Sequence, residues 1–482
     1  MLFNSIEYLL FLPIVFAIYW LLRNHLKLQN LFVVLASYVF YGWWDWRFLI
    51  LIAFTSFCSW GSGLLIDRSK NLKLETLNLK LGAKFWMVTN IVINLGILAV
   101  FKYYDFFVSE FGALFGISTE SLLLRIILPV GISFYTFQAL SYSIDVYRGN
   151  IKPTKDIIAF FAFISFFPQL VAGPIERATN LLPQFLKKRT FSYEQGVDGM
   201  RQILWGLFKK IVVADNCAMY VDQVWSTYDT QSGSTLLLAA VLFTFQIYGD
   251  FSGYSDIAIG TAKLFGIKLM RNFNNPYFSR DIAEFWRRWH ISLTTWFRDY
   301  VYIPMGGSRV SKAKIVRNTF VIFLLSGFWH GANWTFIAWG AYHALLFLPL
   351  ILLGMNRKYT NQVAEGRWLP NVKETGQILL TFMLAVVGWI IFRATSISEA
   401  WSIMKCICDI SLFSMPMMIV GLKRTLFFIA VLLLIEWIDR DKEHALSLSG
   451  LPQWARFIVL YVLILVMLEF MGHSQSFIYF QF

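Results

Sequence analysis

Charged side chains are scarce in this sequence. They make up 15% of its 482 residues, against roughly 25% in soluble domains. Acidic residues are scarcer than basic ones, 29 against 42, while hydrophobic residues reach 57%. This composition excludes an ordinary soluble protein and predicts an all-α polytopic membrane protein. The chain has room for about 10–12 transmembrane helices of ~20 residues, with re-entrant or interfacial helices between them.

Cysteine is also rare. The four cysteines are Cys58, Cys217, Cys406 and Cys408, and the last two are too close in sequence to form a Cys-x-x-Cys pair. We therefore expect no disulfide framework, no metal site and no redox motif. The first residues lack a basic segment and a small-residue cleavage site, so no cleavable signal peptide is expected.

The formal net charge of +13 could indicate nucleic acid. In a chain this apolar, the favoured interpretation is cytoplasmic loops beside anionic lipid, and no nucleic-acid partner is expected. Basic residues follow the first apolar run at Arg23 and Lys27, gather again in 68–84, and precede the last run at Arg440 and Arg456. The positive-inside rule places these loops in the cytoplasm and both termini outside.

Apolar runs mark the expected spans, and Pro129 with Gly131 should kink the fifth one. Gly173-Pro174 is either a re-entrant turn that lines a pore or a plain surface turn. We find no internal repeat and treat 1–482 as one membrane domain. The expected runs are 8–22, 31–41, 48–66, 85–107, 122–142, 157–170, 234–265, 315–353, 378–392, 426–438 and 457–471.

Two Trp-His dipeptides flank a basic loop in the middle of the chain. Trp289-His290 lies in an amphipathic segment, and Trp329-His330 lies in an apolar one. An imidazole in hydrocarbon is costly and usually faces a cavity or a partner. It is also the side chain best suited to proton transfer near neutral pH. From the residues alone, such a histidine is either a packed core residue or a catalytic one.

Several motifs carry a resemblance to a known family. They are Phe285-Trp-Arg-Arg-Trp-His290-Ile-Ser, Arg298-Asp-Tyr-Val-Tyr-Ile-Pro304, Gly327-Phe-Trp-His330-Gly-Ala-Asn-Trp334, Gln246-Ile-Tyr-Gly-Asp250-Phe-Ser-Gly-Tyr-Ser-Asp256 and Val171-Ala-Gly-Pro-Ile175. Together they resemble the membrane-bound O-acyltransferases, and most of all the bacterial branch that acetylates alginate and peptidoglycan. The resemblance implies a bundle of helices around a tunnel.

The resemblance also implies roles for the histidines. His330 would be catalytic, and His290 would support it by orienting the donor or stabilising charge. Acyl transfer to a hydroxyl needs a base, a stabilised carbonyl oxygen and the exclusion of water. We expect Trp329 and Trp334 to wall the site, and His343 to be structural.

The donor side is expected at the basic segments 268–288 and 312–317, which would attract an anionic acyl-CoA, above all acetyl-CoA, or an acyl carrier. Asp250 and Asp256 in an apolar run are functional candidates by default, or else pair with basic residues. Glu284 and Arg288 are spaced to pair on a helix. The donor and tunnel candidates are Trp289, Arg287, Arg288, Trp329, Asn333 and Asp250.

The C-terminal motif 477–482 reads Phe477-Ile-Tyr479-Phe-Gln-Phe482. One interpretation is an interfacial aromatic anchor. It also resembles the aromatic-tyrosine end of the small partner peptide in teichoic-acid D-alanylation. On that resemblance Tyr479 would be a third catalytic residue, a covalent acyl relay activated by His330.

The predicted function is transfer of an acetyl group from a cytoplasmic donor across the bacterial inner membrane for O-acetylation of an exported polysaccharide. No bound cofactor is expected. A secreted or membrane-anchored SGNH-type acetyltransferase would complete the transfer outside. Two alternatives stay open: a direct lipid or protein O-acyltransferase, and a transporter of polysaccharide or acyl groups without chemistry. A transporter predicts repeat symmetry between its halves, which the sequence does not show.

Overall fold

The computed structural model describes the chain apart from residues 72–81, 172, 449, 473–474, 476 and 479–482. In the described part, the regular secondary structure is entirely helical. The helices group into two units, one formed by 1–200 with 258–270 and the other by 201–257 with 271–482. The all-α prediction is therefore confirmed.

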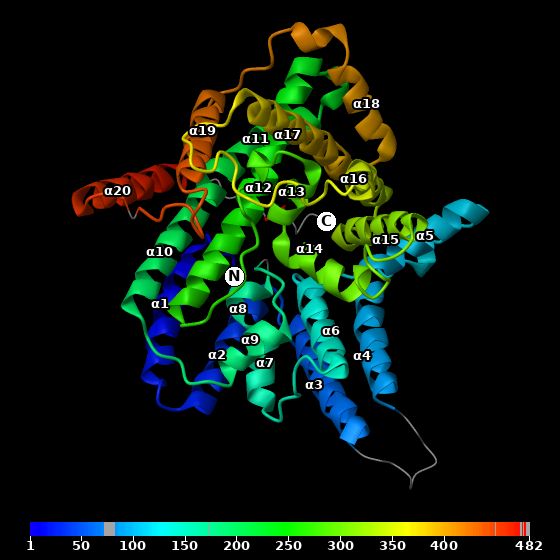
Figure 1. Ribbon diagram of the computed structural model, residues 1–482, viewed down its shortest axis with the longest axis vertical. Coiled ribbons are helices and arrows are strands. Elements are labelled where there is room, and N and C mark those ends of the chain that lie inside the picture. Colours follow the sequence, from blue (N-terminus) through cyan, green and yellow to red (C-terminus); the bar gives the residue numbers. More distant parts are fainter. Residues whose placement is uncertain (72–81, 172, 449, 473–474, 476, 479–482) are drawn as a thin grey trace. The chain divides into compact units, whose positions relative to one another are not determined.

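The first unit contains helices of mixed length (Figure 1). α3, α4 and α6 lie side by side in it. The elements are α1 (Ile6–Leu21), α2 (Leu26–Gly42), α3 (Phe48–Asn71), α4 (Ala83–Leu98), the π-helix η1 (Ala99–Tyr103), α5 (Tyr104–Phe115), η2 (Glu120–Leu122), α6 (Ile132–Arg148), α7 (Ile157–Ser165), α8 (Phe167–Leu170) and α9 (Ala178–Phe185).

Polar and small side chains hold α3, α4 and α6 together. Ser59 on α3 donates to Asn90 Oδ1 on α4 at 3.1 Å, and Asn90 Nδ2 donates in turn to Ser143 on α6. A Cβ at Gly63 on α3 would lie 2.5 Å from the Tyr142 ring on α6, so only glycine permits this approach. Interhelical hydrogen bonds and small residues are the usual means by which helices associate in membranes.

The second unit contains the segment that carries both Trp-His pairs. Two helices continue from one unit into the other along the chain, α10 (Tyr193–Leu207) and α12 (Gly233–Leu264). The other elements are η3 (Phe208–Ala214), α11 (Asp215–Trp225), η4 (Tyr228–Thr230), η5 (Pro276–Phe278), α13 (Ile282–Arg288), α14 (Ile291–Phe297), η6 (Arg298–Tyr302), α15 (Lys312–His330), α16 (Trp334–Leu352), α17 (Val372–Arg393), α18 (Ile397–Ile407), η7 (Ile410–Phe413), α19 (Leu422–Ile438) and α20 (Gln453–Phe470).

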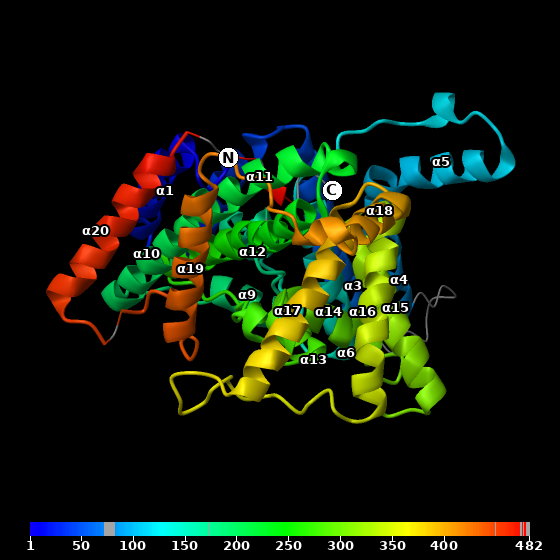
Figure 2. The same ribbon diagram turned by 90° about the horizontal axis from the view of Figure 1, so that it is seen from above.

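α15 and α16 form a tight hairpin, and α17 packs beside α16 (Figure 2). A Cβ at Gly327 would lie 2.1 Å from the carbonyl oxygen of Phe336, and one at Gly340 would lie 2.4 Å from that of Phe323. The two glycines therefore let the helix backbones touch. Asn333 begins α16 as its N-cap, because its side chain accepts from the Thr335 amide.

Six helices in the described residues are long and apolar enough to cross a membrane, and shorter apolar helices accompany them. This supports a multi-pass membrane protein but is fewer than the 10–12 spans expected. Expected run 122–142 is not one helix: 123–128 has no regular structure, and α6 begins only after Gly131, which has a φ of +76°. Expected run 315–353 is the α15–α16 hairpin. Pro129 and Gly131 interrupt the first of these runs, and the Asn333 N-cap begins a new helix within the second.

Candidate active site

His290 lies between α13 and α14 in a left-handed conformation, with a φ of +43° and 1% exposure. Two backbone hydrogen bonds hold this turn: the Asn274 amide donates to Arg288 O at 2.9 Å, and the Ile291 amide donates to Asn272 O at 2.8 Å. A side chain with a Cβ adopts positive φ only when its surroundings impose it, and such residues cluster at functional sites.

The hydrogen bonds around His290 define its tautomer. The Ser292 amide, which can only donate, faces Asn272 Oδ1 at 3.3 Å, while Asn272 Nδ2 donates to Ser255 at 3.0 Å. The Asn272 atom that faces His290 is therefore an oxygen. His290 Nδ1 lies 3.0 Å from it and must carry the hydrogen. Nε2 is left with a free lone pair.

That lone pair lies in the interior of the protein. His290 Nε2 is buried and has no hydrogen-bond partner among the residues that the structure describes. Burial lowers the pKa of His290 to about 3, so the imidazole is neutral at physiological pH. Its ring packs edge-on against Phe251 at 4.7 Å and Trp329 at 5.9 Å between centroids. His290 thus presents a neutral basic nitrogen.

His330 ends α15 and is 4% exposed. Its ring centroid lies 6.5 Å from that of His290, although 40 positions separate the two in the sequence. Aromatic rings surround it at centroid distances of 5.0 Å for Trp329, 5.2 Å for Trp339 and 5.3 Å for Phe392. The structure therefore brings both predicted histidines into one cluster of aromatic side chains.

The walls of this site differ from the sequence-based expectation. Trp329 packs against both histidines as predicted, but Trp334 is 50% exposed. Trp339 on α16 and Phe392 on α17 enclose His330 in place of Trp334. The turn after His330 directs Trp334 outward. Nothing in their sequence context distinguished Trp339, Phe392 or Asn272 from ordinary core residues.

His343 and Trp289 serve the aromatic core behind the site. His343 is 1% exposed and lies between the rings of Trp286 and Trp339. The indole N–H of Trp286 faces His343 Nδ1 at 3.4 Å. Trp289 stacks on Phe285 at 5.6 Å between centroids. These contacts agree with the structural role expected of His343.

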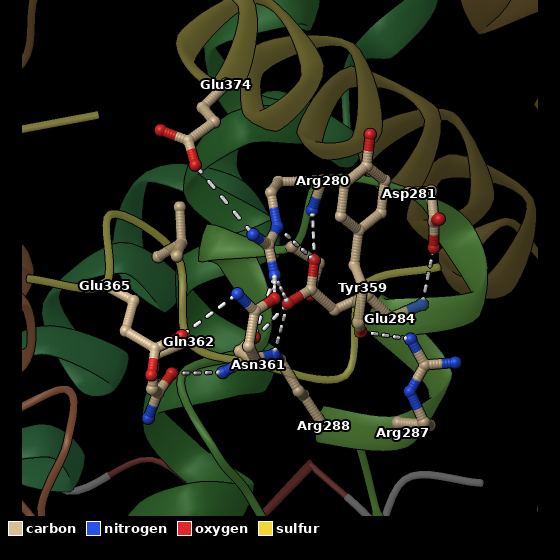
Figure 3. Close-up of polar contacts among 12 residues, drawn as sticks. Arg280, Asp281, Glu284, Arg287, Arg288, Tyr359, Asn361, Gln362, Glu365 and Glu374 are labelled. Atoms are coloured by element: carbon tan, nitrogen blue, oxygen red, sulfur yellow. Dashed lines mark hydrogen bonds and ion pairs between the residues drawn. The ribbon is translucent and has the colours of Figure 1, made fainter. Parts of the chain in front are cut away.

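The arginines of the Arg-Arg-Trp-His motif belong to a polar network (Figure 3). The predicted Glu284–Arg288 pair is confirmed at 2.8 Å, and Arg280 binds the same carboxylate at 3.0 Å. Arg287 instead donates to the carbonyl oxygens of Asn356 at 2.5 Å and Tyr359 at 2.6 Å. Two buried guanidinium groups thus share one carboxylate, and the network ties α13 to the loop that follows α16.

Asp250 on α12 is in a buried ion pair. Lys210 Nζ lies 2.9 Å from Asp250 Oδ1, and the neighbouring Lys209 pairs in the same way with Asp256 at 2.5 Å. The pairing alternative for both acids is therefore the one observed. In the sequence, Lys209 and Lys210 border a polar stretch, which predicts a cytoplasmic interfacial segment. In the structure they are only 2% and 1% exposed. The sequence did not indicate this, because the partners lie some 40 residues further along the chain.

The C-terminal motif begins inside the second unit. Phe477 is fully buried, with its ring centroid 4.2 Å from that of Tyr254 and 6.2 Å from that of Phe251. Phe251 is the ring that packs against His290. An interfacial anchor would expose this phenylalanine to lipid, so that interpretation is wrong for Phe477. Tyr479 lies outside the described residues, and its role stays a prediction.

Comparisons with known proteins agree with these features. The model of the MBOAT, membrane-bound O-acyltransferase family matches residues 154–360, a range that includes both histidines. The chain is 40% identical over 405 residues to “Probable alginate O-acetylase AlgI” of Pseudomonas aeruginosa, covering 83% of this chain and 74% of the relative. It is 34% identical over 436 residues to a peptidoglycan O-acetyltransferase of Helicobacter pylori, covering 84% and 79%. A teichoic acid D-alanyltransferase of Bacillus subtilis is 30% identical over 280 residues, covering 55% and 68%.

Proposed function

The chain belongs to the membrane-bound O-acyltransferase family, and we propose that it moves an acetyl group from cytoplasmic acetyl-CoA across the membrane for O-acetylation of an exported cell-envelope polysaccharide. The observation that carries the proposal is the buried pair of histidines, 6.5 Å apart between ring centroids and enclosed by aromatic rings. The named acceptors of the relatives, alginate and peptidoglycan, indicate the class of polymer.

His330 acts as the general base in this proposal. It takes the proton of the attacking hydroxyl as the new C–O bond forms at the thioester carbonyl and the C–S bond breaks. The thiolate of the donor leaves and receives that proton. His290 supports the step through its neutral Nε2, which can accept a hydrogen bond from the reacting groups. The aromatic walls keep water from the thioester.

Tyr479 would be the first acceptor, so that one long transfer is divided into two shorter ones. Its phenol would receive the acetyl group and then pass it to a nucleophile of a secreted or membrane-anchored SGNH-type acetyltransferase outside. The burial of Phe477 and Ile478 supports this role, since Tyr479 follows them directly in the sequence.

The donor would enter from the cytoplasmic face, in a bacterial inner-membrane protein whose termini both lie outside. Arg287 and the basic segment 312–317 are the proposed attraction for the phosphates of coenzyme A. Arg288 contributes less, because Glu284 already compensates it. Asn333 would shape the tunnel through its cap on α16 and its hydrogen bond to the Thr395 carbonyl oxygen, and Trp289 through its place in the aromatic core.

The test is acetylation of the exported polymer in cells whose only copy carries His330→Ala. We expect acetylation to be lost with normal protein levels in the membrane. His25→Ala, an exposed histidine at the start of α2, is the matched control and should keep full activity. Normal acetylation with His330→Ala would refute the proposed base. Transfer of a labelled acetyl group to a lipid or protein, with the polymer unlabelled, would favour the direct acyltransferase instead.

A further inference from the structure

We infer that Lys210, Asp215 and Asp250 form a binding site for the backbone of the chain's own C-terminal segment, and that these three are positioning residues for that segment. The inference deepens the proposed function, because the segment they hold leads directly into Tyr479. It also names a role for Asp250 other than contact with the donor.

The centre of this site is the ammonium group of Lys210. It lies 2.7 Å from Asp215 and 2.9 Å from Asp250, and it donates to the carbonyl oxygen of Gln475 at 3.0 Å. A lysine has three N–H donors. Two of the three acceptors are carboxylates, Asp215 on α11 and Asp250 on α12, and the third is a backbone carbonyl oxygen of the tail.

Asp215 and Asp250 also bind the tail. Asp250 Oδ2 accepts the backbone amide of Ile478 at 2.6 Å, and Asp215 accepts the backbone amide of Gln475. Each polar contact goes to a backbone group rather than to a side chain. Between these contacts, the Phe477 ring packs on Tyr254 at 4.2 Å between centroids. The site therefore contacts the tail at the backbone of Gln475, at the backbone amide of Ile478 and at the Phe477 ring.

Without the tail, the buried cluster of Lys210, Asp215 and Asp250 would be energetically unfavourable. One lysine and two aspartates carry a formal charge of −1, and all three are at least 95% buried. A buried charge that loses a partner is strongly destabilising, whereas charge-assisted hydrogen bonds to backbone amides compensate it. The amides of Gln475 and Ile478 supply two such bonds to the acids. We conclude that the acids are arranged for a peptide backbone and that the tail is their ligand.

A second cluster of the same construction lies on the same two elements. Lys209 and Lys210 are adjacent in the π-helix η3, and both face α12. Lys209 pairs with Asp256 at 2.5 Å and donates to Ser252 at 2.9 Å, while Gln202 donates to Asp256. In the described part of the chain, these partners lie outside the tail. Asp256→Asn thus removes a neighbouring lysine–aspartate ion pair, whose acid is 16% exposed, without touching the proposed binding site.

Hydrogen exchange of the full-length protein in detergent or nanodiscs tests the binding site directly. In Asp250→Asn, amide exchange in the C-terminal peptide should accelerate about tenfold or more, the effect of losing one charge-assisted hydrogen bond. In Asp256→Asn, the same peptide should exchange as in the wild type. Equal exchange in all three proteins would overturn the inference, and equal acceleration in both variants would reduce Asp250 to a general stabilising residue.

A second pair of variants leaves the cluster intact and changes only the tail. Ile478→Pro removes the amide that Asp250 accepts, and Ile478→Ala removes most of the side chain but keeps that amide. We expect C-terminal exchange to rise and polymer acetylation to fall much further with proline than with alanine. Identical exchange and activity in the two variants would show that the amide contributes nothing and would overturn the inference.

The two proposals fail separately. If His330→Ala keeps its activity while Asp250→Asn still releases the tail, the binding site stands and the proposed chemistry fails. If His330→Ala is inactive and tail exchange is insensitive to Asp250→Asn and Ile478→Pro, the chemistry stands and the binding site is refuted.

Discussion

Asn272→Asp is the most direct test of how His290 is held. The substitution replaces an amide by a carboxylate of the same shape, 3.0 Å from His290 Nδ1. The oxygen that accepts from His290 and Ser292 remains, and Ser255 can rotate its hydroxyl to donate to the new oxygen. The variant therefore changes the charge beside the imidazole while keeping the local packing.

The magnitude follows from the present pKa of His290. Burial lowers that pKa to about 3, and an opposite charge within ~4 Å raises a pKa by about 1–3 units. In the variant, the pKa of His290 should therefore lie at about 4–6. The raised pKa means that the imidazole gains a proton at Nε2 as the pH falls through this range. With a pKa of about 6, about one enzyme in eleven keeps the neutral form at pH 5.

The assay is acetyl transfer in proteoliposomes from pH 4 to pH 8. The ratio of variant rate to wild-type rate cancels the titration of groups that both proteins share. We expect this ratio to be constant near pH 8 and to fall at pH 4 by about twofold if the variant pKa is about 4, and by about a hundredfold if it is about 6. Asn274→Asp adds a carboxylate to the same loop without a contact to the imidazole, and its ratio should stay flat. A flat ratio for Asn272→Asp would refute the role given to His290 Nε2.

Three further predictions concern stability and topology. Gly327→Ala should lower the free energy of unfolding by about 1–3 kcal/mol or more in thermal unfolding, because its Cβ would overlap a carbonyl oxygen of α16. Gly376→Ala, with open space around it, should change stability little, and equal effects would contradict the tight hairpin. Glu284→Gln should lower the free energy of unfolding by about 3–5 kcal/mol in the same measurement, since buried Arg288 loses its counter-charge and Arg280 keeps only Glu374 at 3.9 Å. An unchanged melting temperature would argue against the network. A cysteine in place of Ser311 should resist an impermeant external reagent in intact cells, and labelling would contradict the cytoplasmic loop.

The sequence predicted the membrane class, and it pointed to His290 and His330 as candidates, because both inferences depend on local properties. Hydrophobic content fixes how the chain partitions into lipid. The motifs around His290 and His330 are continuous stretches that need no folding to be recognised. The number of spans was less predictable, since hydropathy joined α15 and α16 into one run across Gly331 and missed the chain without regular structure at 123–128.

The site's detail came from long-range packing. Asn272 controls the tautomer of His290 only because the turn at positive φ places them side by side. Trp339 and Phe392 enclose His330 because α16 and α17 pack against α15, and Trp334, nearest in sequence, turns outward.

Sequence alone therefore determined that this chain is a helical membrane acyltransferase with two histidines in its central segment. Tertiary structure decided what each polar group meets. In the sequence, Lys209 and Lys210 form a basic pair beside a polar stretch. Both are nevertheless buried, because acids on α12 compensate their positive charges. The aromatic sequence of the tail is compatible with an interfacial anchor, but Phe477 is buried in the interior. Partition into lipid sums over single residues, whereas charge compensation in a dry interior depends on partners far apart in the chain.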